Sequence, residues 1–202
     1  MLFTKPVTTT VQELLDKNAV RELIEFERFC RDNALWDEMR RCFMPGATVT
    51  VSWYQGGAAG FIDASRRMES PAPHKLNNTL VWLNEKKAVA VTMASIQIRK
   101  TINKVPCDMV SYVRFLYKTQ KVDSEWFVES MDCIYEKDCL VPVLPGGFTS
   151  GSPVVRKSYS TLAAVLGAEG YPIAGDLPGD DLPETVHALL REAEGWLGSR
   201  QD

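Results

Sequence analysis

Apolar residues recur along the first part of the chain at the three- and four-residue spacing of a helix with one buried face. Upstream of this run, Thr10 and Glu13 have the spacing of a capping box, in which each side chain satisfies a free amide at a helix start. The pattern predicts one long amphipathic helix from about Thr10 to Asp32. Its apolar face comprises Val20, Leu23, Ile24, Phe26, Phe29 and Cys30. The charged residues on the opposite face are Arg21, Glu22, Glu25, Arg28 and Arg31.

After this helix the period changes from that of a helix to that of a strand. A short helical turn is predicted over residues 37–43, and Pro45 and Gly46 end it. Residues 47–53 alternate small or apolar side chains with polar ones and predict a strand. A glycine-rich connection leads to a short predicted helix over residues 61–68, which the following prolines terminate.

Four further strands are predicted, at 74–83, 88–102, 109–118 and 126–135, with short polar turns after the first and third. Such turns join neighbouring strands in an antiparallel meander, so the fold class is α+β, with helices first and a curved antiparallel sheet after them. Strand alternation places Tyr112 and Arg114 on one face. It also places Trp126, Ser130 and Asp132 on one face.

The last third of the chain differs in composition. We expect residues 1–138 to form the main domain and residues 139–202 to form an extension that packs on it, because two short helices give too small a core to stand alone. One helix is predicted at 159–166. A second begins at Asp181, whose spacing to Glu184 is that of another capping box, and runs to about Leu197.

Composition narrows the classes of partner and compartment. The formal net charge is −3 over 202 residues, which gives no electrostatic reason to expect nucleic acid or an anionic membrane as a partner. The five cysteines are odd in number and lack the Cys-x-x-Cys spacing, which argues against a disulfide framework or a structural zinc site. No signal peptide and no apolar run of membrane length is evident. We therefore expect a cytoplasmic protein.

Five segments, in their order and spacing, resemble the SnoaL-like branch of the nuclear transport factor 2 superfamily. These segments are Asn18–Leu23, Asp32–Asp37, Phe43–Thr48, His74–Asn78 and Trp126–Ser130. The resemblance implies a cone-shaped sheet wrapped round the long helix, open at one end to a mostly apolar ligand. Members include polyketide cyclases, scytalone dehydratase, hexachlorocyclohexane dehydrochlorinase, steroid isomerases and epoxide hydrolases, and also non-catalytic subunits of dioxygenases. The fold therefore does not fix the function.

The resemblance also places two residues. Asp32 falls on the catalytic aspartate, and His74 on the catalytic histidine, of the dehydratase and dehydrochlorinase members. Removal of a proton beside an electron-withdrawing group needs a base such as imidazole, and a carboxylate on one ring nitrogen orients it. This chemistry needs no metal or cofactor. In the alternative interpretation, Asp32 ends a helix and His74 is a hydrogen-bonded strand-end residue. His187, in the last helix, is expected to be a surface or packing residue.

Further aromatic and polar residues are candidates for substrate binding, with ordinary core packing as the alternative. They are Trp53, Tyr54, Asn78, Tyr112, Arg114, Trp126 and Asp132. The favoured hypothesis is a cofactor-independent lyase, isomerase or cyclase that acts on a hydrophobic, cyclic small molecule such as a polyketide or terpenoid intermediate. The other hypothesis is a non-catalytic ligand-binding or subunit-assembly protein. A homodimer or higher homo-oligomer is expected. The enzyme hypothesis gains support if Asp32 contacts His74 inside an enclosed apolar cavity, and it fails if His74 faces solvent or if side chains fill the cone.

Overall fold

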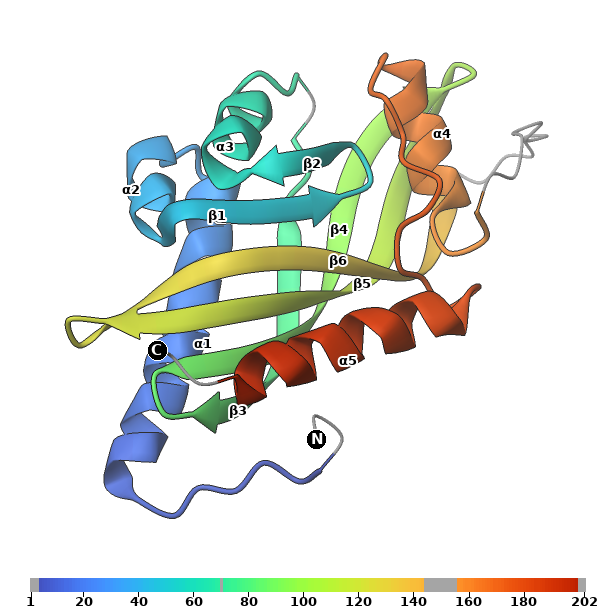
Figure 1. The fold of residues 1–202 in the computed structure, drawn as a ribbon. Helices are drawn as coiled ribbons and strands as arrows, with labels where there is room; N and C mark the ends of the chain where they lie inside the picture. Colours follow the sequence, from blue (N-terminus) through green and yellow to red (C-terminus); the bar gives the residue numbers. More distant parts are fainter. Residues whose placement is uncertain (1–3, 70, 144–155, 200–202) are drawn as a thin grey trace.

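A computed structural model describes residues 4–69, 71–143 and 156–199 (Figure 1). The chain begins with the long helix α1 (Val11–Asp32), as the sequence predicts. The predicted capping box is present, because Thr10 Oγ1 accepts the backbone N–H of Glu13 at 3.1 Å and the Glu13 carboxylate accepts the backbone N–H of Thr10. Two short helices follow later, α2 (Trp36–Arg41) and α3 (Ala58–Arg66).

Six strands form one curved sheet in the order β2-β1-β6-β5-β4-β3. The strands are β1 (Phe43–Val51), β2 (Tyr54–Gly57), β3 (His74–Asn84), β4 (Lys87–Ile102), β5 (Val105–Val122) and β6 (Glu125–Pro142). β3 to β6 make the predicted antiparallel meander. β1 pairs parallel with β6, which places an early strand beside the last one and closes the curve of the sheet.

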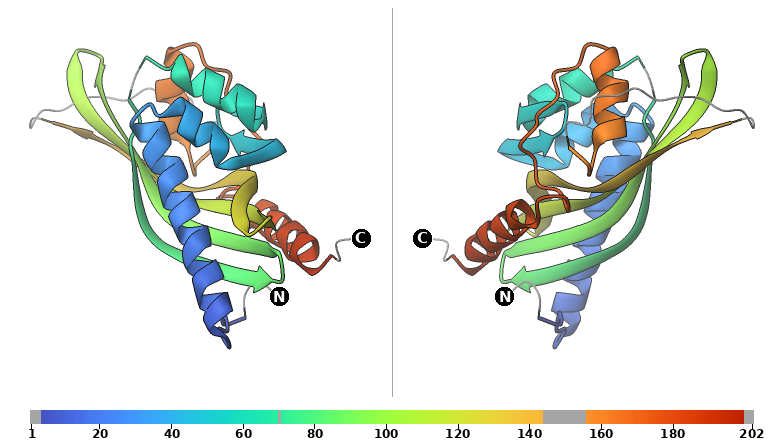
Figure 2. Two further views of the ribbon diagram at one scale, coloured as in Figure 1. Left: turned by 90° about the vertical axis from the view of Figure 1, so that its left-hand side faces the viewer. Right: turned by 90° about the vertical axis from the view of Figure 1, so that its right-hand side faces the viewer.

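The concave side of the sheet holds α1 and the main core (Figure 2). Val20 and Ile24 of α1 are fully buried there, together with Phe115 and Tyr117 of β5 and Met131 of β6. Burial of these side chains supplies the hydrophobic free energy that holds helix and sheet together. The fold is therefore the α+β arrangement of a curved sheet around a long helix.

The face of α1 that meets the sheet differs from the predicted apolar face. Phe26 and Phe29 are 44% and 54% exposed, so their predicted burial is wrong, and their rings stack on each other at 6.5 Å. Glu27 and Arg28 are buried instead. The helix turns charged residues inward because these residues pair with each other and with groups inside the cone.

A bulge in β6 changes the predicted register of its side chains. Lys118 pairs with Ser130 but Thr119 pairs with Val128, so β6 contains one extra residue at this point. Trp126 therefore packs in the concave core, whereas Asp132 lies on the opposite face beside Lys118. The prediction that Trp126 and Asp132 share a face is wrong, because a bulge reverses the alternation beyond it.

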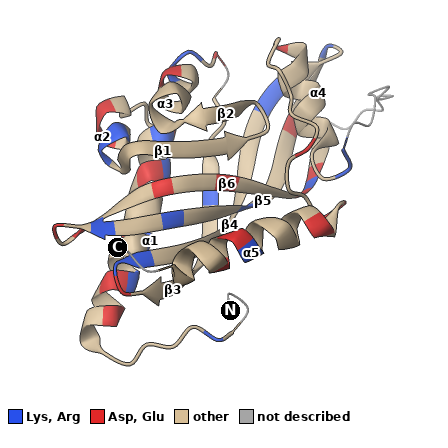
Figure 3. Cartoon of the chain, in the orientation of Figure 1, with Lys and Arg blue, Asp and Glu red and all other residues tan. Residues whose placement is uncertain are grey.

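The C-terminal segment contributes two helices, α4 (Ser160–Ala168) and α5 (Pro183–Gly198). Val186, Leu190 and Ala193 of α5 pack on the convex side of the sheet, against Leu116 and Ile134. α4 lies against the concave side, at the end of the sheet away from the N-terminus of α1 (Figure 1). Acidic and basic residues both occur along α1 and α5 (Figure 3).

The start of α5 does not use the predicted capping box. Leu182 is the N-cap residue and no side chain caps the helix. The Asp181 carboxylate instead accepts hydrogen bonds from Arg156 at 2.7 and 3.0 Å and from the Ser158 hydroxyl at 2.7 Å, and so ties the two ends of the α4 segment together. Within the described ranges, no helix is both long enough and apolar enough to cross a bilayer.

Candidate active site at the end of helix α1

Asp32 and His74 meet at the end of α1. Asp32 is the last residue of α1 and His74 is the first residue of β3. Asp32 Oδ1 lies 2.8 Å from His74 Nδ1, and Asp32 Oδ2 accepts the backbone N–H of His74 at 2.6 Å. A carboxylate at a helix C-terminus faces the negative end of the helix dipole, which is unfavourable by itself. The hydrogen bonds from the two N–H groups of His74 compensate for this unfavourable placement of the Asp32 charge.

The neighbouring backbone fixes where His74 begins its strand. The carbonyl of Pro73 accepts the N–H of Gln97 at 2.9 Å, and His74 then pairs with Ile96 on β4. The pairing turns the His74 side chain to the concave side, where it is only 4% exposed. Because Asp32 engages Nδ1, the ring nitrogen left for a ligand is Nε2.

The protonation states suit a general base. Burial, together with the positive charges of Arg31 and Arg28, lowers the pKa of His74 to about 4 against the opposing effect of Asp32. Burial alone would raise the pKa of Asp32, but the hydrogen bonds from His74 outweigh burial and hold it below its ordinary value. At neutral pH the pair is therefore a neutral imidazole with an ionised carboxylate.

The low pKa of His74 predicts a pH-dependent stability. Between pH 6.5 and about 4 the unfolded chain binds a proton at this histidine and the folded chain does not, so stability falls as the pH falls through this window. We expect wild-type protein to lose up to about 3 kcal/mol more than His74→Gln over this range. Urea unfolding of both proteins at several pH values measures the difference, and parallel curves would contradict it.

The two hydrogen bonds between residue 32 and His74 require two acceptor oxygens on residue 32. Asp32→Asn keeps the shape but turns an NH₂ group against either the ring N–H or the backbone N–H of His74. We expect a loss of about 1–3 kcal/mol in unfolding free energy, the usual effect of an unsatisfied buried donor. Thermal or urea denaturation checks this result. Asp63→Asn, at an exposed site on α3, is the matched control. An equal effect of both changes would contradict a stabilising role of the two Asp32–His74 hydrogen bonds.

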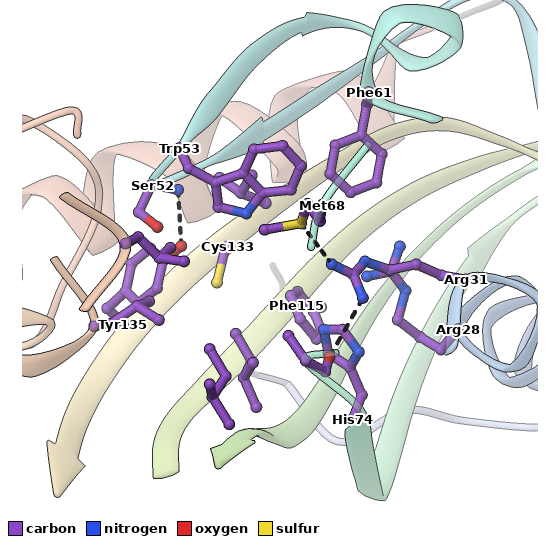
Figure 4. Close-up of a pocket in the computed structure, with 16 residues that line it drawn as sticks. Arg28, Arg31, Ser52, Trp53, Phe61, Met68, His74, Phe115, Cys133 and Tyr135 are labelled. Carbon is purple, nitrogen blue, oxygen red and sulfur yellow. Dashed lines mark hydrogen bonds between the residues drawn. The ribbon is translucent and has the colours of Figure 1, made fainter. Parts of the chain in front are cut away.

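His74 lines a cavity inside the cone (Figure 4). Trp53, Phe61, Met68 and Phe115 make most of its aromatic and sulfur-containing wall, and Leu162 and Leu166 of α4 close it. Its volume is about 30 Å³, which is close to the share of one water molecule in the liquid. Pockets for drug-sized ligands have about 300–1,000 Å³. A small cavity therefore remains in the cone, His74 does not face solvent, and a cyclic ligand requires the lining side chains to move.

A buried polar cluster lies beside His74. Glu27 accepts a hydrogen bond from Arg28 Nε at 2.6 Å and one from the Tyr117 hydroxyl at 3.1 Å. The Arg28 guanidinium lies 5.4 Å from the centre of the Phe115 ring, and that ring lies 5.7 Å from the His74 ring. Arg28 is the member of this cluster that lines the cavity, and Glu27 and Tyr117 support it from behind.

Arg28 and Arg31 both line the cavity, although the sequence pattern predicts them on the exposed face. Their side chains are 3% and 9% exposed, so that prediction is wrong. The signal that could have found them is their spacing from Val20 and Ile24, because positions 20, 24, 28 and 31 follow the same three- and four-residue steps.

One of the predicted substrate-binding residues lines the cavity, namely Trp53. Tyr54 packs on Trp53 with ring centres 6.1 Å apart, and its hydroxyl donates to the carbonyl of Gly57 at 2.8 Å. Tyr54 therefore supports the cavity wall from behind.

The other candidates lie elsewhere. Asn78 and Tyr112 are exposed on the sheet. Arg114 pairs with Glu136 at 2.9 Å and with Asp180, away from the cavity. The Trp126 indole donates to Asp16 Oδ1 at 3.0 Å, further toward the N-terminus of α1, and Asp132 lies on the convex side. His187 is exposed on α5, as the sequence predicts.

Residues 12–132 match the family model described as a SnoaL-like domain. The chain belongs to this family. The match covers most of the chain and contains both Asp32 and His74. In the described residues, no group of three or more His, Cys, Asp and Glu side chains is arranged to hold a metal ion.

Relatives of this SnoaL-like protein include a named fungal protein. Pea pathogenicity protein 2 of Fusarium vanettenii is 29% identical over 92% of this chain and 85% of its own length. Among solved structures, a putative scytalone dehydratase of Novosphingobium aromaticivorans matches with a TM-score of 0.56 at 14% identity, over 72% of this chain and 99% of its own. A hexachlorocyclohexane dehydrochlorinase matches with a TM-score of 0.56 at 12% identity, over 71% and 99%. These two structures establish a shared fold.

Proposed function

We propose that this SnoaL-like protein is a cofactor-independent lyase, isomerase or cyclase that removes a proton from a hydrophobic, cyclic small molecule, such as a polyketide or terpenoid intermediate. The observation that carries the proposal is the buried Asp32–His74 pair, held by two hydrogen bonds at the edge of an apolar cavity. The two structural neighbours are a putative scytalone dehydratase and a hexachlorocyclohexane dehydrochlorinase, and both names denote elimination chemistry.

The geometry supports a simple sequence of proton transfers. The Nδ1–H of His74 donates to Asp32, which fixes the tautomer and directs the lone pair of Nε2 to the cavity. Nε2 takes a proton from a carbon beside an electron-withdrawing group, and Asp32 stabilises the imidazolium that forms. His74 then returns the proton, to a leaving oxygen in a dehydration or to another carbon in an isomerisation.

Entry of a cyclic substrate requires the wall contributed by α4 to open. Among the described residues, polar contacts of α4 lie near its two ends. The backbone N–H of Leu162 donates to Asp138 Oδ2 at 2.8 Å, and Lys100 pairs with Glu169 at the other end of the helix. Outward movement of Leu162 and Leu166 would enlarge the cavity without breaking the sheet.

The small volume of the cavity favours a second candidate function, a non-catalytic subunit-assembly protein with the same fold. One experiment separates the two candidates. A panel of cyclic ketones and polyketides is incubated with the protein in D₂O, and exchange of carbon-bound hydrogen is followed by NMR. Exchange that depends on His74 supports the enzyme, and equal rates with wild-type protein and His74→Ala would reject the proposed base.

A further inference from the structure

Two guanidinium groups lie next to the His74 ring on the cavity wall (Figure 4). Arg28 and Arg31 stand three residues apart on α1, which puts them on one side of the helix. Both reach the same region, because Asp32 Oδ1 lies 2.8 Å from His74 Nδ1 and 3.5 Å from Arg31 Nη1. The proposed base and a buried cation are therefore close neighbours.

The two arginines differ in how well they are paired. Arg28 makes a two-point ion pair with Glu27, which partly offsets its charge. The contacts of Arg31 are weaker. Its Nη1 donates to the carbonyl of Ala72 at 3.3 Å, and its Nη2 faces the Met68 thioether at 3.4 Å, where sulfur is a weak acceptor.

Arg31 shares the carboxylate of Asp32 with His74. The oxygens of Asp32 are directed to His74, and the 3.5 Å distance to Arg31 is longer than an ordinary hydrogen bond. Burial, with the charge of Arg28 adding to it, lowers the pKa of Arg31 to about 10, so Arg31 is still a cation at neutral pH. A buried cation with such weak partners is a site for an oxygen anion.

We infer that Arg31 binds the carbonyl oxygen of a ketone substrate and stabilises the enolate that forms when His74 removes the neighbouring proton. This inference rests on the proposed function. In the step, the C–H bond breaks, its proton moves to Nε2 of His74, and its electron pair forms a carbon–carbon double bond. The carbonyl π electrons move to oxygen, beside Arg31. Return of the proton at another carbon, or loss of a β-hydroxyl as water, completes the reaction.

Charge balance explains why the step needs Arg31. The positive charges of Arg31 and Arg28 oppose protonation of His74. An enolate oxygen on Arg31 cancels part of that opposition at the moment when the imidazolium forms. Arg31 therefore holds the substrate oxygen, and the negative charge that forms on this oxygen offsets the opposition of Arg31 to protonation of His74.

Fused-ring phenols test this inference without turnover, because an ionised phenol resembles an enolate. The probes are 2-naphthol, naphthalene as the ring without oxygen, and 2-naphthoate as a carboxylate. Fluorescence titration gives each Kd, and the emission of 2-naphthol reports whether its hydroxyl is ionised. We expect wild-type protein to bind 2-naphthol in its ionised form. Arg31→Met should bind 2-naphthol roughly 10–100-fold more weakly and naphthalene equally well.

Two variants serve as controls. Arg31→Lys keeps the charge and should recover part of the affinity, and Arg67→Met removes an exposed arginine and should change nothing. Equal affinity of wild-type protein and Arg31→Met for 2-naphthol, including absence of binding by both, overturns the inference. If 2-naphthoate binds more tightly than 2-naphthol and this binding depends on Arg31, the ketone assignment is overturned and the substrate is a carboxylate. Because these titrations do not involve proton abstraction, they can fail while the His74 exchange experiment succeeds, and the reverse.

Discussion

Replacement of His74 by alanine is expected to lower the rate of proton abstraction by about 10²–10⁴-fold, the usual contribution of a positioned general base. The variant keeps the Asp32 carboxylate and both arginines but has no group with a lone pair at the position of Nε2. Substrate affinity should change much less than the rate, because the apolar wall and Arg31 are intact. The measurement is kcat and KM for a ketone that exchanges in the D₂O screen.

The second histidine provides a matched control for this prediction. His187 is exposed on α5 and does not line the cavity, so His187→Ala should retain full activity. Imidazole added to His74→Ala should restore part of the rate, provided that it reaches the space left by the side chain. A His74→Ala enzyme with an unchanged rate, or an equal loss in both variants, would remove His74 from the mechanism.

Much of this framework can be predicted from the chain alone, because the relevant interactions are local. The capping box at Thr10, the ends of α1 and the β3–β6 meander depend on residues within a few positions of each other. The contact between Asp32 and His74 spans 42 positions, and it was the family resemblance that pointed to it. The strand β2 (Tyr54–Gly57) escaped prediction because its glycines have no side-chain alternation.

What escaped prediction depends on packing between distant segments. Hydrophobic periodicity assigns charged residues to solvent, yet the cone surrounds a polar cluster, and so Arg28 turns inward while Phe29 remains exposed. The bulge at Glu129 arises from the pairing between β5 and β6, and the sequence of neither strand predicts it. Leu162 of α4 closes the cavity by packing near residues far earlier in the chain, such as Trp53, which lies 109 positions before it (162 − 53).

The burial of Glu27 and Arg28 on the inner face of α1 leads to the largest stability effect that we expect. Glu27→Gln removes the negative charge that pairs with Arg28, while Glu27 and Arg28 are 0% and 3% exposed. A buried cation without its partner destabilises a protein by about 3–5 kcal/mol. For a domain of this size the melting temperature should fall by about 6–20 °C. Urea and thermal denaturation measure both quantities.

A matched substitution and a double variant separate the charge from the loss of shape. Glu25→Gln, two positions earlier and exposed, should change stability by no more than about 0.5 kcal/mol. The double variant Glu27→Leu with Arg28→Met replaces the pair by apolar side chains of similar volume, and such replacements are often neutral or stabilising. We expect it to be more stable than Glu27→Gln. If it is equally unstable, the Tyr117 hydroxyl, which would then lose its acceptor at 3.1 Å, contributes more than the ion pair.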